Sequence, residues 1–106
     1  MTLFDTESLP SIIQKGAIEW NRHALERMME RGISRRDVMN VLLDGEIIEH
    51  YPSDYPFPSV LMFGKLDMTP LHVVVACDND RETIYIITAY YPDDVHFLGD
   101  HKTRRT

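Results

Sequence analysis

The period of the hydrophobic pattern changes at Glu46, and this change constrains the fold more than any other feature of the chain. Before Glu46 apolar residues recur every three or four positions, which is the spacing of one helix face. After Glu46 they alternate with polar residues or form short runs, as in "EIIEHY" and "VVVAC", a pattern typical of strands. Helices followed by strands predict an α+β fold, with N-terminal helices packed on one face of a curved, mainly antiparallel four-stranded sheet.

Short-range signals mark where these elements begin and end. Asn21 and Ser34 are residue types that cap helix N-termini, and Ser34 with Asp37 resembles a capping box. Gly32 and Gly45 stand where helices would stop. Helices are therefore expected over residues 10–16, 21–31 and 35–44, and strands near residues 46–51, 59–66, 70–78 and 82–91.

A chain of 106 residues can form one hydrophobic core, so we expect a single domain over residues 1–106. The helices and the sheet should meet through the apolar residues that recur at helical or strand spacing. These are Leu25, Met28, Val38, Val41, Leu42, Val73, Val75, Ile84 and Ile86.

The sequence predicts neither a membrane protein nor a secreted protein. The apolar runs are far shorter than the roughly 20 residues that cross a bilayer, and the acidic N-terminus lacks the order of a secretory signal. The lone Cys77 can form neither an internal disulfide nor a cysteine zinc site. We therefore expect a cytoplasmic protein with no cofactor and no contact to a membrane.

Charge is distributed unevenly along the chain. A net charge of −6 argues against a nucleic-acid-binding protein, because phosphate contacts need clustered Lys and Arg. Residues 22–36 and 101–106 are nevertheless basic segments in an otherwise acidic chain. The acidic remainder would suit a basic partner protein, whereas the two basic segments could contact phosphate.

His23, Arg27 and Arg31 follow one another at intervals of four in "HALERMMERGIS". On a helix at about 100° per residue they form a row along one edge of the apolar arc that contains Met28 and Met29. Such a row is either a solvated face with weak charge pairs or a set of side chains that lean over the sheet. Both interpretations are open at the level of sequence.

His72, Thr88 and Tyr90 are polar residues within the last two expected strands. If the hairpin loop between these strands has an odd number of residues, His72 pairs with Thr88 and all three share one face. An even loop would place His72 on the opposite face. The alternative roles are structural, with His72 as a hydrogen-bonded residue and Tyr90 as an aromatic residue at the rim.

These residue types can cleave RNA without a metal. A base removes the proton of the ribose 2′-hydroxyl, the 2′-oxygen attacks the phosphorus, and an acid protonates the departing 5′-oxygen. Guanidinium groups match phosphate oxygens and stabilise charge in the transition state. The candidate catalytic residues are His23, His72 and Tyr90. The candidate phosphate-binding residues are Arg27, Arg31 and Thr88.

The motifs "H-A-x-E-R-M-x-E-R-G-I-S", "GEIIE", "LHVVVA" and "YIITAYYPD" resemble a family of small bacterial domains of unknown function. That family is grouped with RelE-like and MqsR-like toxins, in the barnase, EndoU, colicin and RelE ribonuclease fold. The resemblance extends from Trp20 to Arg105. It implies a RelE-like domain that acts as a metal-independent endoribonuclease toxin of the mRNA interferase type, with an RNA site between the His23 helix and the sheet.

The resemblance also bears on individual residues and on partners. The family's polar positions match His23, Arg27 and Arg31 on the helix and His72, Thr88 and Tyr90 on the strands. The closing "GDHKTRR" is similar to the family's basic tail, which adds Arg104 and Arg105 as RNA-binding candidates. A cognate antitoxin, often a small protein with a zinc-binding module and a helix-turn-helix domain, is implied as the partner. Ribosome-dependent RelE-type toxins are strongly basic, so the acidity of this chain argues against ribosome docking and leaves both free RNA and no RNA substrate at all open.

Two functions of other classes compete with this one. One is a non-catalytic protein-binding module on the same fold. It is compatible with the six Met residues and with "EIIEHY" as an exposed edge strand. Metal binding by His96 and His101 with a nearby Asp is the other, but that spacing is too weak to predict a metal site.

Overall fold

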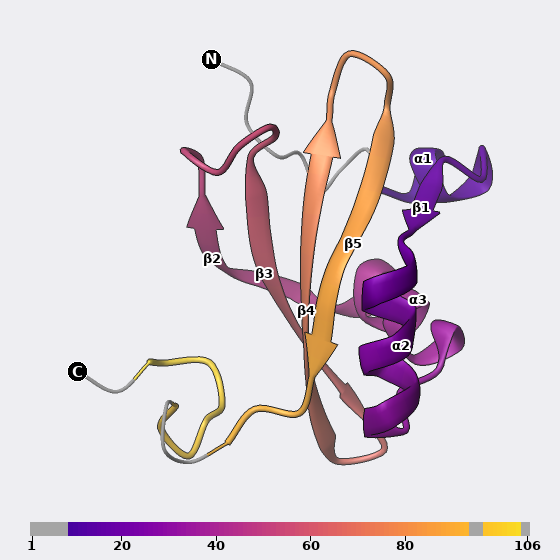
Figure 1. Cartoon of the computed structure of the whole chain (residues 1–106). Helices are drawn as coiled ribbons and strands as arrows, with labels where there is room; N and C mark the ends of the chain where they lie inside the picture. The colour runs from indigo at the N-terminus through magenta and orange to yellow at the C-terminus, as the bar shows by residue number, and fades with distance from the viewer. Residues whose placement is uncertain (1–8, 94–96, 105–106) are drawn as a thin grey trace.

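The computed structural model describes residues 9–93 and 97–104 (Figure 1). Its elements, in chain order, are α1 (Leu9–Gln14), β1 (Ile18–Trp20), α2 (Arg22–Arg31), α3 (Arg35–Asp44), β2 (Glu46–Tyr51), β3 (Ser59–Leu66), β4 (Thr69–Asp78) and β5 (Thr83–Tyr90). The three expected helices and the four expected strands all occur, with boundaries within two residues of the prediction.

The predicted four-stranded antiparallel sheet was wrong. The sheet has five strands in the order β1-β5-β4-β3-β2, and β1 runs parallel to β5, so the sheet is mixed. The pairing places Ile18 beside Ile84 and Trp20 beside Ile86, and the carbonyl of Ala17 accepts the N–H of Ile84 at 2.9 Å. Three residues are too few to show a strand period, which is why the pattern of the sequence did not reveal β1.

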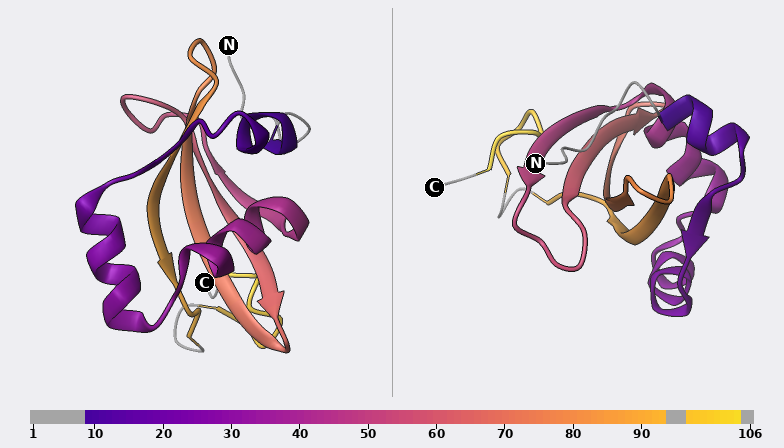
Figure 2. Two further views of the ribbon diagram at one scale, coloured as in Figure 1. Left: turned by 90° about the vertical axis from the view of Figure 1, so that its right-hand side faces the viewer. Right: turned by 90° about the horizontal axis from the view of Figure 1, so that it is seen from above.

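The helices do not all lie on one face of the sheet either. Helix α3 packs against β3 and β4 on the back of the sheet as drawn in Figure 1, and α1 contacts α3. Helix α2 follows directly from β1 and stands along β5 at the edge, apart from α3 (Figure 2). Because β1 is an edge strand and α2 follows it directly, α2 lies beside the sheet and not in the layer formed by α1 and α3.

Local hydrogen bonds explain where α2 and α3 begin. The side chain of Asn21 accepts the N–H of Ala24 at 2.7 Å, which caps α2. Ser34 and Asp37 exchange hydrogen bonds of 3.0 Å between side chain and backbone, which confirms the capping box of α3. Gly32 ends α2 in the left-handed region at φ 71°, where a residue without Cβ is favoured.

The core lies between α3 and the sheet, and α2 closes it along β5. Of the nine residues expected to join helices and sheet, eight are buried and Leu25 is half-buried. Met29 contradicts the helical-wheel prediction, since it is 77% exposed while its neighbour Met28 is 2% exposed. The buried arc of α2 is therefore narrower than the apolar residues of the sequence suggested. No helix in the described ranges is long and apolar enough to cross a membrane.

Candidate functional site

The face of the sheet opposite α3 carries the predicted polar residues of the strands. The β4–β5 loop spans residues 79–82, because Asp78 pairs with Thr83. This even loop alone would have put His72 on the other face, but the register shifts between Val74 and Val75. His72 therefore pairs with Tyr90 rather than with Thr88. The expected common face of the three polar residues exists, although a bulge and not an odd loop creates it.

His72 is a fully buried histidine whose two ring nitrogens both have partners. Its Nε2 lies 2.6 Å from the carbonyl oxygen of His101, and its Nδ1 lies 3.4 Å from the hydroxyl of Tyr90. A carbonyl can only accept, so Nε2 carries the proton and Nδ1 accepts from the tyrosine. Burial lowers the pKa of His72 and raises the pKa of Tyr90, so both groups are neutral at physiological pH.

A short C-terminal turn covers His72. The ring of Phe97, itself 2% exposed, stands edge-on to the imidazole of His72 at 4.6 Å between centroids. The carboxylate of Asp100 accepts from the backbone N–H groups of Lys102 and Thr103, each at 2.9 Å, and this closes the turn. We call residues 97–104 the C-terminal cover.

Arg104 anchors this cover to the far edge of the sheet. Its Nε and Nη2 donate to the two carboxylate oxygens of Glu49 at 3.0 and 2.9 Å, and its guanidinium lies 4.7 Å from the ring centroid of Phe97. This hydrogen bonding lowers the pKa of Glu49, whereas burial and the neighbouring Glu49 raise the pKa of Tyr51 to about 12. Arg104 thus sits in an ion pair rather than open to phosphate, and Arg105 lies outside the described residues.

The row predicted on α2 is present, and its last member reaches the sheet. Arg31 donates through Nη1 to the hydroxyl of Thr88 at 3.3 Å and to the carbonyl of Ala89 at 2.9 Å. Arg27 pairs with Glu30 on the helix surface at 3.1 Å. His23 is exposed and makes no hydrogen bond or ion pair within residues 9–93 and 97–104.

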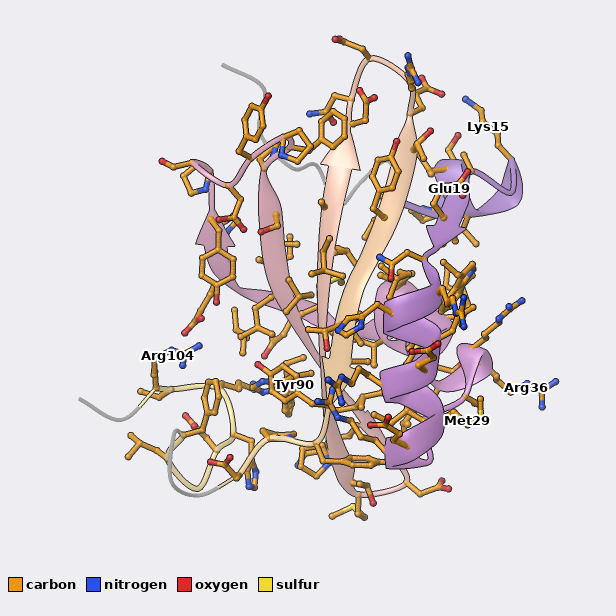
Figure 3. The ribbon with its side chains drawn as sticks, viewed as in Figure 1. Lys15, Glu19, Met29, Arg36, Tyr90 and Arg104 are labelled. Atoms are coloured by element: carbon orange, nitrogen blue, oxygen red, sulfur yellow. The ribbon has the colours of Figure 1, made fainter. Side chains whose placement is uncertain are left out.

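The structure therefore brings the predicted residues together as two contacting pairs on the same face. Arg31 with Thr88 is one pair, and His72 with Tyr90 is the other. Thr88 and Tyr90 are two positions apart on β5, which corresponds to about 7 Å along a strand. Figure 3 shows Tyr90 extending from β5 toward the cover that bears Arg104. His23 and Arg27 lie further along the row and touch neither pair.

Sequence reasoning missed the residues that hold the C-terminal cover. Glu46 and Glu49 of β2 bind Lys102 and Arg104 of the cover. One signal was available, because these carboxylates stand in a strand and "HKTRR" is the basic end of the chain. Opposite charges of this kind indicate a contact but do not say which residues pair.

A metal centre is not apparent in the described ranges. Within residues 9–93 and 97–104 no three side chains of His, Cys, Asp or Glu gather closely enough to hold an ion. His96, one of the two histidines considered as ligands, lies outside those ranges.

The fold and the site together define a small α+β domain with a mixed sheet, in which Arg31 of α2 is hydrogen-bonded to β5. The chain belongs to the family described as Domain of unknown function (DUF4258), which matches residues 20–91. This range contains α2 and every strand residue of the candidate site, whereas the C-terminal cover follows it in sequence. No curated protein matches the chain.

Proposed function

We propose that this protein is a metal-independent endoribonuclease toxin of a bacterial toxin–antitoxin pair, acting on RNA in the cytoplasm. The observation that carries the proposal is the contact of Arg31 with Thr88 and Ala89, which holds a guanidinium against β5, two strand positions from Tyr90. Within the described part of the chain only Nη1 of Arg31 makes hydrogen bonds, so its other N–H groups can bind a phosphate.

The neighbouring side chains supply further contacts to such a phosphate. Arg27 pairs with Glu30 on the helix surface, and a pair of this kind is worth about 0.2–0.5 kcal/mol, so a phosphate can compete for Arg27. Tyr90 keeps its proton because burial raises its pKa, and it would donate to a phosphoryl oxygen by giving up its long hydrogen bond to Nδ1 of His72. These groups would stabilise the charge that develops on the phosphorane.

His23 is the residue that we assign to proton transfer. It is exposed, and histidine is the side chain that most often transfers protons in catalysis. As base it would remove the proton of the 2′-hydroxyl, and the 2′-oxygen would form a bond to phosphorus as the bond from phosphorus to the 5′-oxygen breaks. A water molecule would protonate the departing 5′-oxygen, and the resulting hydroxide would take the proton back from His23. The products are a 2′,3′-cyclic phosphate and a 5′-hydroxyl end. His72 is buried with both nitrogens engaged, so we assign it a positioning role toward Tyr90 instead of a catalytic one.

The test is RNA cleavage by the purified full-length chain in the presence of EDTA. Cleavage that survives chelation and leaves 2′,3′-cyclic phosphate ends is the expected result. Expression of the chain should also arrest growth, and co-expression of the protein encoded beside it should relieve the arrest, since we propose that this partner is a zinc-binding or helix-turn-helix antitoxin. Intact RNA and normal growth would contradict the proposal.

A second candidate function is a non-catalytic protein-binding module. The observation that favours it is the position of β2 at the end of the strand order, where no other strand of residues 9–93 and 97–104 pairs with its outer edge. Such an edge can accept a strand from a partner, and the net charge of −6 favours a basic one. The module would bind its partner and leave RNA intact, so the cleavage assay separates the two functions.

A further inference from the structure

A pocket of about 410 Å³ opens on the same face of the sheet as Thr88 and Tyr90. Ala76 and Tyr85 line it and pair with each other, and Ala76 alternates along β4 in step with His72, which fixes the shared face. Its volume falls within the roughly 300–1,000 Å³ of small-ligand sites. The side chains that matter for its chemistry are Asn21, Asp54, Tyr55, Phe57, Tyr85 and Ile87.

Aromatic and apolar side chains form most of the wall. The rings of Phe57 and Tyr85 are parallel within 2°, with centroids 5.4 Å apart. Tyr55 is 94% exposed and Ile87 is 44% exposed, so neither residue serves the hydrophobic core. Parallel rings beside an open tyrosine are suited to a flat aromatic ligand, because such a ligand extends the stack.

The pocket adjoins the proposed phosphate site at two points. Asn21 lines the pocket and is also the cap of α2, whose ten residues, nearly three turns, carry the row that begins near the pocket at His23 and ends at Arg31. Ile87 lines the pocket and is followed directly by Thr88, which accepts from Arg31. One strand residue spans about 3.4 Å, so a base in the pocket and a phosphate at Arg31 fit within one or two nucleotides.

The carboxylate of Asp54 decides which part of a nucleotide enters. It accepts a hydrogen bond from the buried Ser59 hydroxyl, which leaves further lone pairs on the carboxylate. A carboxylate repels a phosphate and accepts N–H groups from a base edge. The charges therefore direct the base into the pocket and the phosphate toward the α2 row.

We propose that this pocket is a nucleobase subsite for single-stranded RNA, with preference for bases that bear an exocyclic amino group over uracil. The inference rests on the proposed function, and it names how the same site would select its substrate. Stacking on aromatic side chains would supply binding, and Asp54 would supply the preference.

The test measures binding of fluorescent 2′-O-methyl oligonucleotides of about ten nucleotides, a length within the usual site sizes. These probes lack the attacking hydroxyl and stay intact. Oligo(A) and oligo(U) report the base preference, and inorganic polyphosphate reports the phosphate site alone. The unaltered chain is compared with the pocket variants Tyr55→Ala, Tyr85→Leu and Asp54→Asn. Arg31→Ala tests the phosphate site, and Tyr91→Ala is the control, because Tyr91 is an exposed tyrosine outside the pocket.

Tyr55→Ala should weaken oligo(A) binding by roughly 5- to 150-fold, the equivalent of about 1–3 kcal/mol, with polyphosphate affinity and the salt slope unchanged. Asp54→Asn should remove the preference for oligo(A) over oligo(U).

If Tyr55→Ala and Tyr85→Leu both bind like wild type while Arg31→Ala binds weakly, the pocket inference is overturned and the proposed function stands. If the wild-type chain binds no oligonucleotide, the proposed function fails and takes the inference with it. If the pocket variants lose binding to the co-expressed antitoxin but still bind RNA like wild type, the pocket binds protein and the inference is likewise overturned.

Discussion

His72 donates a hydrogen bond of 2.6 Å through Nε2 to the carbonyl oxygen of His101, a residue that lies 29 positions later in the chain. Because Nδ1 of the same ring faces the Tyr90 hydroxyl, one buried imidazole links β4, β5 and the C-terminal cover. The cover is therefore part of the folded domain, held by a neutral histidine at its centre and by the Arg104–Glu49 ion pair at its end.

This relationship predicts how stability depends on pH. Burial lowers the pKa of His72 from its ordinary value of 6.5, so the unfolded chain takes up this proton at a higher pH than the folded chain. The stability that neutral His72 contributes is complete above pH 6.5 and is lost as the pH falls below it. We expect the free energy of unfolding, measured by urea titration, to decrease as the pH falls below 6.5.

The variant His72→Gln isolates this effect. It should be less stable than wild type at neutral pH, and its stability should change less over the same interval. Glu49 acts at lower pH, because Arg104 holds the pKa of that carboxyl below 4.5 and its contribution is lost only below that value. Parallel pH profiles for wild type and His72→Gln would show that His72 does not titrate on unfolding.

Two adjacent methionines test the packing of α2. Met28 is 2% exposed and Met29 is 77% exposed. Met28→Ala should reduce the free energy of unfolding by about 2–5 kcal/mol, since it leaves a cavity in the core. Met29→Ala, as the matched control, should change it by no more than about 0.5 kcal/mol. Equal losses in urea unfolding would mean that α2 is rotated from the orientation described.

The arginines of the row should determine the salt dependence of RNA binding. Arg31→Ala and Arg27→Ala should each weaken binding, and each lost phosphate contact should reduce the slope of log K against log salt by about 0.7. Arg36→Ala is the control, because Arg36 projects from α3 away from β5 (Figure 3). The measurement is a fluorescence titration at several salt concentrations, and an unchanged slope in the double variant would exclude both residues as phosphate ligands.

His23→Ala should lower ribonuclease activity by about 10²–10⁴-fold, the usual contribution of a positioned proton-transfer group. The thermal midpoint should stay near that of wild type, since an exposed side chain leaves no cavity. His50→Ala removes an exposed histidine from β2, at the other end of the strand order, and should keep full activity. Full activity in a folded His23→Ala variant would assign the row to a solvated helix face.

The sequence predicted those helices and strands whose caps or hydrophobic periodicity lie within a few consecutive residues. The cap at Asn21 and the capping box at Ser34 set the starts of α2 and α3, and the alternation in β2 to β5 set the strands. The row of His23, Arg27 and Arg31 was likewise a consequence of helical spacing. These predictions succeeded because each depends on hydrogen bonds or periodicity inside one element.

Contacts between distant segments were decided by the tertiary structure alone. β1 becomes a strand only because β5 offers it an edge, and three residues carry no period of their own. His72 shares a face with Tyr90 because a bulge in β5 offsets an even hairpin loop, and neither loop length nor bulge has a distinct sequence signature here. The pairing of Arg104 with Glu49 spans 55 residues. The sequence by itself determined the helices, the main strands and the polar row, whereas the sheet order, the register and the covered histidine follow from packing, because their stabilising contacts exist only once the whole chain has folded.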